Sequence, residues 1–223
     1  FVRSQRYEDA ISFIDRQLKA TPTNYIYLHI KGTALLGTGD KAAAKSHFLR
    51  ALNLNPEFIP SLLNLARLDI NEAQWVSARN YLDKVLAIDF RNRAALKMLS
   101  RIEHETGDLQ ASILMLEKAM ELELEIGPGI TLVNLLYNQN RVVAATDYVE
   151  KLASHFPESL LAQTVKAELS LKSNNAERAR RTYRHMALMA QEKQSVSWLL
   201  KIAKDQLTMD EIKAAFRTLN MAK

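Results

Sequence analysis

The chain has 223 residues, of which 48% are hydrophobic and 25% are charged, a balance typical of a folded globular protein rather than a disordered one. It contains no cysteine, which excludes disulfide bonds, thiolate metal sites and a cysteine nucleophile. The formal net charge of +5 permits an acidic partner without requiring one.

A repeating pattern of residue size runs along the chain from its beginning. Residues separated by the same interval as Ala10 and Ala44 match in size. The series that starts at Ala10 contains only small residues, and the series that starts at Ile14 contains only large apolar ones. The small column is Ala10, Ala44, Ala78 and Ser112, and the large column is Ile14, Phe48, Leu82 and Leu116. Columns that agree in size over this length indicate a structural repeat.

Each repeat is predicted to be a pair of helices, because its apolar residues recur at helical spacing with two interruptions. The interruptions fall at Gly39, Ala73 and Gly107 and at Pro22 and Pro56. The small columns are expected where the two helices of a pair approach closely. No strand-like alternation and no Asn-Gly or Asp-Gly hairpin turn is present. The predicted fold class is therefore all-α, an α-solenoid of stacked antiparallel helix pairs.

We predict one solenoid domain over residues 1–223. Its repeats are a partial one at 1–24, full ones at 25–58, 59–92 and 93–126, weaker ones at 127–159 and 160–193, and a divergent end at 194–223. The turn near Asn140 has lost one residue, and Lys166 stands where an apolar residue is usual, which weakens the prediction of a helix there. Because both ends cut through repeats, we expect self-association through the truncated ends.

The first full repeats resemble the tetratricopeptide repeat. The residues that carry this resemblance are Leu28, Gly32, Leu35, Ala44, Phe48, Ala51 and Pro56, then Leu62, Leu65, Ala66, Ala78 and Leu82. The resemblance implies a right-handed superhelix whose concave surface is lined by the first helix of each pair. It also implies a scaffold that binds a peptide or a partner protein in that groove.

By repeat position, eight residues are expected to line the concave surface and bind the partner. They are His29, Thr33, Leu63, Arg67, Asn71, Lys97, Arg101 and His104. Arg67 and Arg101 occupy the same place on successive first helices, and Lys97 lies one turn before Arg101. These cations predict an acidic or carbonyl-rich partner segment, unless Glu105 neutralises Arg101 as its i+4 neighbour.

The carboxylate clamp that some tetratricopeptide proteins use for chaperone tails can be compared position by position. The resemblance would require lysine and asparagine at His29 and Thr33, asparagine at Asn64, and lysine and arginine at Ala94 and Met98. Asn64 alone agrees, so a chaperone-tail adaptor is disfavoured.

A narrower resemblance concerns residues 62–89, LLNLARLDINEAQWVSARNYLDKVLAID, and the later LEKAM at 116–120. These phrases are similar to repeat lipoproteins that accompany bacterial exosortase and PEP-CTERM sorting loci, which implies a scaffold in the bacterial cell envelope or periplasm. Without that resemblance the expected location is cytoplasmic. The chain begins at Phe1 without a methionine, which predicts that it is a piece of a longer protein. No apolar run reaches the roughly 18 residues of a membrane span.

Enzymatic chemistry is not predicted, and neither a cofactor nor a metal is expected. His104 and Glu105 begin a zinc-helix motif, but Asp108 stands where the second histidine is needed. The basic run ERARRTYRH at 177–185 is interpreted as solvated surface, since Arg178, Arg181 and His185 fall on one helix face, opposite Tyr183, and therefore present no tyrosine on which bases could stack. The alternatives to a protein-binding scaffold are an RNA- or polysaccharide-binding solenoid and a structural spacer of a longer chain.

Overall fold

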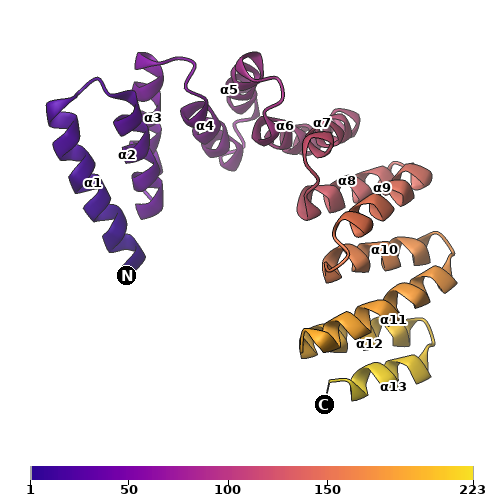
Figure 1. Ribbon diagram of the computed structural model, residues 1–223. Coiled ribbons are helices and arrows are strands. Elements are labelled where there is room, and N and C mark those ends of the chain that lie inside the picture. The colour runs from indigo at the N-terminus through magenta and orange to yellow at the C-terminus, as the bar shows by residue number, and fades with distance from the viewer. Residues whose placement is uncertain (1, 223) are drawn as a thin grey trace. The chain divides into compact units, whose positions relative to one another are not determined.

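The computed structural model describes residues 2–222, with side chains from Arg6 onward. Over this range every regular element is an α-helix and no strand occurs, which confirms the all-α prediction (Figure 1). The chain divides after Leu122 into two compact units, which we call unit 1 and unit 2. The prediction of one solenoid domain over the whole chain stays a prediction.

Unit 1 contains a single helix followed by three helix pairs. Its helices are α1 Val2–Ala20, α2 Tyr25–Thr38, α3 Lys41–Leu54, α4 Ile59–Asn71, α5 Trp75–Ile88, α6 Arg93–Thr106 and α7 Leu109–Leu122. Each pair packs mainly within itself, α2 on α3, α4 on α5 and α6 on α7, and consecutive pairs meet through α3 with α4 and α5 with α6.

Unit 2 contains three further pairs. They are α8 Ile126–Asn138 with α9 Val142–His155, α10 Leu160–Lys172 with α11 Ala176–Glu192, and α12 Val196–Thr208 with α13 Ile212–Asn220. The helix at α10 forms although Lys166 lies in it, because Lys166 Nζ is paired with Glu150 Oε2 of α9 at 3.0 Å. The charge that weakened the prediction of this helix is therefore compensated.

A left-handed residue closes the first helix of each repeat. Gly39 and Gly107 take φ values of 94° and 92° there. In the other repeats the same place is taken by Ala73, Asn140, Asn174 and Asp210, with φ values of 54°, 58°, 58° and 59°. The left-handed region is open to glycine and is accessible to asparagine at a lower cost than to most residues. From Gly107 to Asn140 the spacing is one residue shorter than from Gly39 to Ala73, which is the deletion expected near Asn140.

In the pairs α2–α3 and α6–α7 the second helix begins with an aspartate side-chain cap. Asp40 accepts the backbone N–H of Ala43 at 3.0 Å, and Asp108 accepts that of Ala111 at 2.9 Å. An aspartate at this position satisfies one of the N–H groups that a helix start leaves unpaired. The Gly-Asp dipeptide is therefore the local reason why the sequence pattern recurs at Gly39 and at Gly107.

The small columns lie where the two helices of a pair cross, as the pattern predicts. A Cβ atom on Gly32 would lie 2.6 Å from the Phe48 ring, so only glycine fits this crossing of α2 and α3 without movement. Ala78 is fully buried against α4. In the third pair the crossing is polar, since the Ser112 hydroxyl lies 3.0 Å from that of Ser100 and donates to the Ser100 carbonyl oxygen at 2.9 Å.

The apolar residues of α1 differ in how well they are packed. Ile14 of α1 is only 4% exposed, because α1 packs directly on α2. Phe13, by contrast, is 53% exposed. Self-association through the ends stays a prediction, and Ile14 does not contribute to it.

The crossing of α4 and α5 provides a test of close packing. Ala78→Leu is expected to lower the free energy of unfolding by about 1–3 kcal/mol, because the added carbons have no space at a fully buried site. Ala87→Leu, on the exposed side of the same helix, is the matched control and is expected to change stability by about 0.5 kcal/mol or less. Urea denaturation followed by circular dichroism measures both, and equal losses would contradict this crossing.

Candidate partner-binding surface

All eight residues predicted to bind a partner lie on the first helices of the three pairs in unit 1. Thr33, Arg67, Asn71, Arg101 and His104 are exposed, whereas His29, Leu63 and Lys97 are half-buried. Helices α4 and α6 contact each other directly, so their residues belong to one surface. We call the exposed members of the set on α2, α4 and α6 the first-helix surface.

His29 is held in the contact between α2 and α4 and is not simply exposed. Its ring centroid lies 5.4 Å from that of Phe48 and 5.2 Å from that of Phe58, and its Nδ1 lies 3.0 Å from the Ser61 hydroxyl. Burial lowers the pKa of His29, so the imidazole is neutral at pH 7. This histidine joins two repeats and presents only part of its ring to a partner.

The two arginines at equivalent places differ in their local partners. Arg67 Nη1 donates to Asn64 Oδ1 at 3.1 Å, which orients the guanidinium without neutralising it. Arg101 and Glu105 are both exposed and are not ion-paired, so the expected i+4 neutralisation does not occur. Lys97 is half-buried and already interacts within the chain. The exposed cations of this surface are therefore Arg67 and Arg101.

The described residues were also compared with the requirements of a metal site and of a membrane-spanning helix. Among residues 2–222, histidine, aspartate and glutamate side chains do not gather in threes in a way that could hold a metal ion. None of the described helices is long and apolar enough to cross a membrane.

The chain is similar in sequence to known repeat proteins over part of its length. A tetratricopeptide-repeat family model matches residues 25–58, which contain α2 and α3. The tetratricopeptide repeat and J domain-containing co-chaperone DNJ1 of Fusarium oxysporum f. sp. lycopersici is 34% identical over 71 residues, which are 32% of this chain and 14% of that protein. The chain thus spans a small part of the length of this relative.

Solved structures with the same fold cover more of the chain. The C-terminal part of a tetratricopeptide repeat-containing protein from Cytophaga hutchinsonii matches with a TM-score of 0.77 at 12% identity, covering 96% of this chain and 89% of that one. YrrB, a tetratricopeptide-repeat protein with an unusual peptide-binding site, matches with a TM-score of 0.62 at 14% identity, covering 77% of this chain and 89% of its own. The chain therefore has the fold of these tetratricopeptide-repeat structures, and residues 25–58 match the repeat family itself. The narrower resemblance to PEP-CTERM-associated lipoproteins is not confirmed.

Ion pairs with buried carboxylates join consecutive repeats in unit 1. Lys45 Nζ of α3 lies 2.6 Å from Oδ1 of Asp69 on α4, and Asp69 also accepts a hydrogen bond from the Ser77 hydroxyl. One repeat later, Arg79 Nη1 of α5 lies 2.5 Å from Oε1 of Glu103 on α6. Asp69 is fully buried and Glu103 is 8% exposed, so each carboxylate depends on the cation from the preceding repeat.

The sequence contains a signal for these pairs in its charged residues, which a pattern of residue size does not reveal. Lys45 and Arg79 are one repeat length apart, and so are Asp69 and Glu103. Helices α4 and α6 carry Asp69, Glu103 and Glu105 as their carboxylates, and the first two are buried in the ion pairs. Glu105 is therefore the only exposed carboxylate on α4 and α6, the two helices that carry Arg67 and Arg101.

The Lys45 pair predicts a defined loss of stability. Lys45→Met should lower the free energy of unfolding by about 1–3 kcal/mol, because the Asp69 carboxylate remains fully buried without its cation. Lys41→Met, at an exposed site on the same helix, is the control and should cost about 0.5 kcal/mol or less. Chemical denaturation of both variants at neutral pH measures the difference.

The same variant has an expected pH dependence. The hydrogen bond with Asp69 raises the pKa of Lys45 above 10.5, so the stabilisation is complete below 10.5 and is lost as pH rises through the folded-state pKa. The difference in stability between wild type and Lys45→Met should therefore be constant from about pH 7 to about pH 9 and shrink at higher pH. A difference that grew at alkaline pH would show that the ion pair does not stabilise the fold.

Proposed function

We propose that this chain is a non-enzymatic scaffold that binds a peptide or protein segment on the first-helix surface. The observation that carries the proposal is the exposure of Arg67 and Arg101 at equivalent places on α4 and α6. Two of the three carboxylates on these helices, Asp69 and Glu103, are buried in ion pairs with other cations and do not neutralise the two arginines. A guanidinium group binds a carboxylate through two parallel hydrogen bonds. A partner segment with acidic side chains or exposed carbonyl groups fits this surface best.

The relatives support a protein-binding role of this general kind. DNJ1 is a co-chaperone, and YrrB has a peptide-binding site. A chaperone tail is a poor candidate for this chain, because His29 packs between repeats and Ala94 and Met98 carry no charge. A role in envelope polysaccharide export or protein sorting rests on the sequence phrases at 62–89 and 116–120.

Binding to RNA or to an acidic polysaccharide is less well supported. The basic run at 177–185 is largely committed to ion pairs: Arg178 is paired with Glu150, and Arg180 Nε lies 2.7 Å from Glu211 Oε1. Arg181 Nε lies 3.2 Å from Glu177 Oε1. These contacts reduce the positive charge that a polyanion would bind. A structural spacer predicts that the isolated chain captures no partner.

The test is a quantitative comparison of captured partners. Immobilised wild type and the double variant Arg67→Ala/Arg101→Ala are incubated with a proteolysed cell extract, and bound segments are identified by mass spectrometry. We expect acidic segments to be retained by wild type and depleted about tenfold or more by the double variant, because two charge-assisted contacts are removed.

The matched control is Arg50→Ala/Lys84→Ala, which removes two exposed cations one repeat apart on the second helices α3 and α5. It should retain the wild-type set of segments. An identical set for all three proteins would place binding away from Arg67 and Arg101 and would contradict the proposal.

A further inference from the structure

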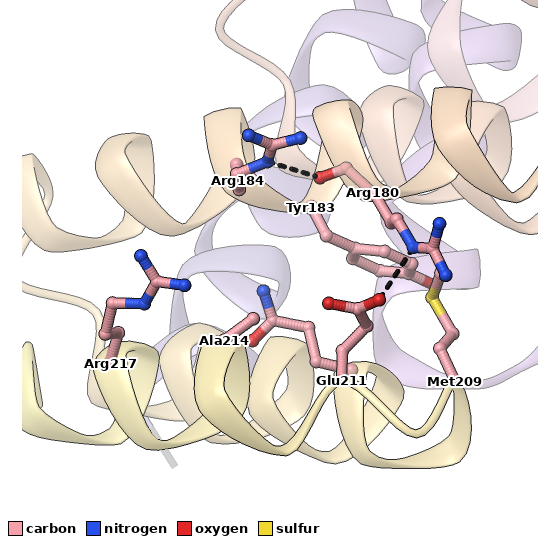
Figure 2. Close-up of a pocket in the computed structure, with 8 residues that line it drawn as sticks. Arg180, Tyr183, Arg184, Met209, Glu211, Ala214 and Arg217 are labelled. Carbon is pink, nitrogen blue, oxygen red and sulfur yellow. Dashed lines mark hydrogen bonds and ion pairs between the residues drawn. The ribbon is translucent and has the colours of Figure 1, made fainter.

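A cleft lies among the last three helices of unit 2. It has a volume of about 250 Å³ and is lined by Arg180, Tyr183, Arg184, Gln206, Met209, Glu211, Ala214 and Arg217 (Figure 2). A second hollow of about 220 Å³ shares Arg184, Gln206, Ala214 and Arg217 with it. Because four residues line both hollows, they form one continuous cleft, which we call the α11–α13 cleft.

The arginines that line the cleft on α11 differ in how far carboxylates compensate their charge. Arg180 is neutralised by Glu211 at 2.7 Å. Arg184 Nη2 lies 3.8 Å from Glu177 Oε1, and that carboxylate oxygen is closer to Arg181, at 3.2 Å. Arg184 is thus only weakly compensated, and its Nε donates to a backbone oxygen at 3.4 Å.

Arg217 faces the cleft from α13. Its Nε donates to the Lys213 carbonyl oxygen at 3.3 Å, and no carboxylate of the described residues pairs with it. Figure 2 shows Arg184 on α11 and Arg217 on α13, with Ala214 beside the space between the two helices. Arg184 and Arg217 thus both line the two hollows with little acidic compensation, and guanidinium groups bind carboxylates through charge-assisted hydrogen bonds.

The second hollow is apolar next to these arginines. Ala187, Leu188 and Met221 line it together with Thr218. Leu188 is 52% exposed, although it lies on the same helix as fully packed residues such as Met186. An aliphatic side chain placed here would cover Leu188 and leave the water.

Buried contacts hold the walls of the cleft in place. The Thr218 hydroxyl donates to Gln206 Oε1 at 2.8 Å, which joins α12 to α13. Tyr183 is 1% exposed, and burial raises the pKa of its phenol, so the hydroxyl stays protonated at neutral pH. These contacts fix the helices that carry Arg184 and Arg217, so the ligand has only exposed side chains to order when it binds.

We propose that the α11–α13 cleft is a second binding site, for a peptide segment in which a carboxylate side chain is adjacent to an aliphatic one. The carboxylate lies between Arg184 and Arg217, and the aliphatic side chain packs on Ala187, Leu188 and Met221. This goes beyond the proposed function, because the cleft uses no residue of the first-helix surface. Charge complementarity selects an acidic segment, and the adjacent apolar hollow selects the neighbouring side chain.

The experiment uses three fluorescent peptides and the whole chain. The first is Gly-Ser-Asp-Leu-Glu-Leu-Gly-Ser, the second replaces both leucines with serine, and the third replaces the acids with asparagine and glutamine. Fluorescence anisotropy should show that the first peptide binds about tenfold or more tightly than either of the others. Amide shifts in ¹H–¹⁵N spectra should map to α11 and α13.

Matched variants test each half of the site. Arg184→Gln/Arg217→Gln should weaken binding of the first peptide about tenfold or more. The control Lys204→Gln/Lys213→Gln removes two exposed cations of α12 and α13 that do not line the cleft, and it should change binding about twofold or less. Leu188→Ser should weaken binding, and Leu200→Ser, at a side chain of 51% exposure outside the cleft, should not.

Several results would overturn the proposal. If the serine peptide bound as tightly as the first peptide, the cleft would be a general anion site. The same conclusion would follow if polyuridylate or vesicles rich in phosphatidylserine displaced the first peptide. Shifts confined to α4 and α6, with no effect of Arg184→Gln/Arg217→Gln, would assign the peptide to the first-helix surface and support only the proposed function. Failure of the first peptide to bind at all would also reject the cleft.

Discussion

The close approach of two helices within each repeat is the constraint on which the rest of the structure depends. At the first crossing in unit 1 there is no room for a side chain, since a Cβ on Gly32 would lie 2.6 Å from the Phe48 ring. Later crossings use alanine or a hydrogen-bonded pair of serines, so the residue changes while the small size is kept. Because the inner faces of a pair are occupied by this crossing, its outer faces make the contacts with neighbouring repeats.

Ion pairs supply a second link, from one repeat to the next. Lys45 with Asp69 and Arg79 with Glu103 each connect the second helix of one repeat to the first helix of the following one. A buried ion pair is weak evidence for added stability, but removing either partner is costly, so the pair favours one way of stacking over others. In this chain it also determines the charge that remains for binding, because the carboxylates at Asp69 and Glu103 are no longer available at the surface.

Much of this fold can be predicted from residue size alone. The helix pairs, the turn that loses a residue near Asn140 and the small columns follow from the repeat, since each depends on neighbours close in sequence. The ion pairs are harder to predict from the sequence, because the two partners of each pair come from different repeats. The charges also recur in only two repeats, at Lys45 and Arg79 and at Asp69 and Glu103. The repeat pattern also gave too little weight to the helix that contains Lys166, because the charge of Lys166 is compensated by Glu150 from another helix.

The α11–α13 cleft shows most clearly why charge in a sequence does not identify a binding site. Arg180 and Arg184 are one helical turn apart in the same basic run, and nothing in the run distinguishes them. Glu211 lies in the divergent end of the chain, where no repeat register predicts its position, and it neutralises Arg180 alone. Arg184 lines the cleft together with Arg217, because the residue that α13 places there is an arginine and not a second carboxylate like Glu211. The functional difference between the two arginines therefore arises from the packing of α13 on α12, which the Thr218 to Gln206 hydrogen bond maintains.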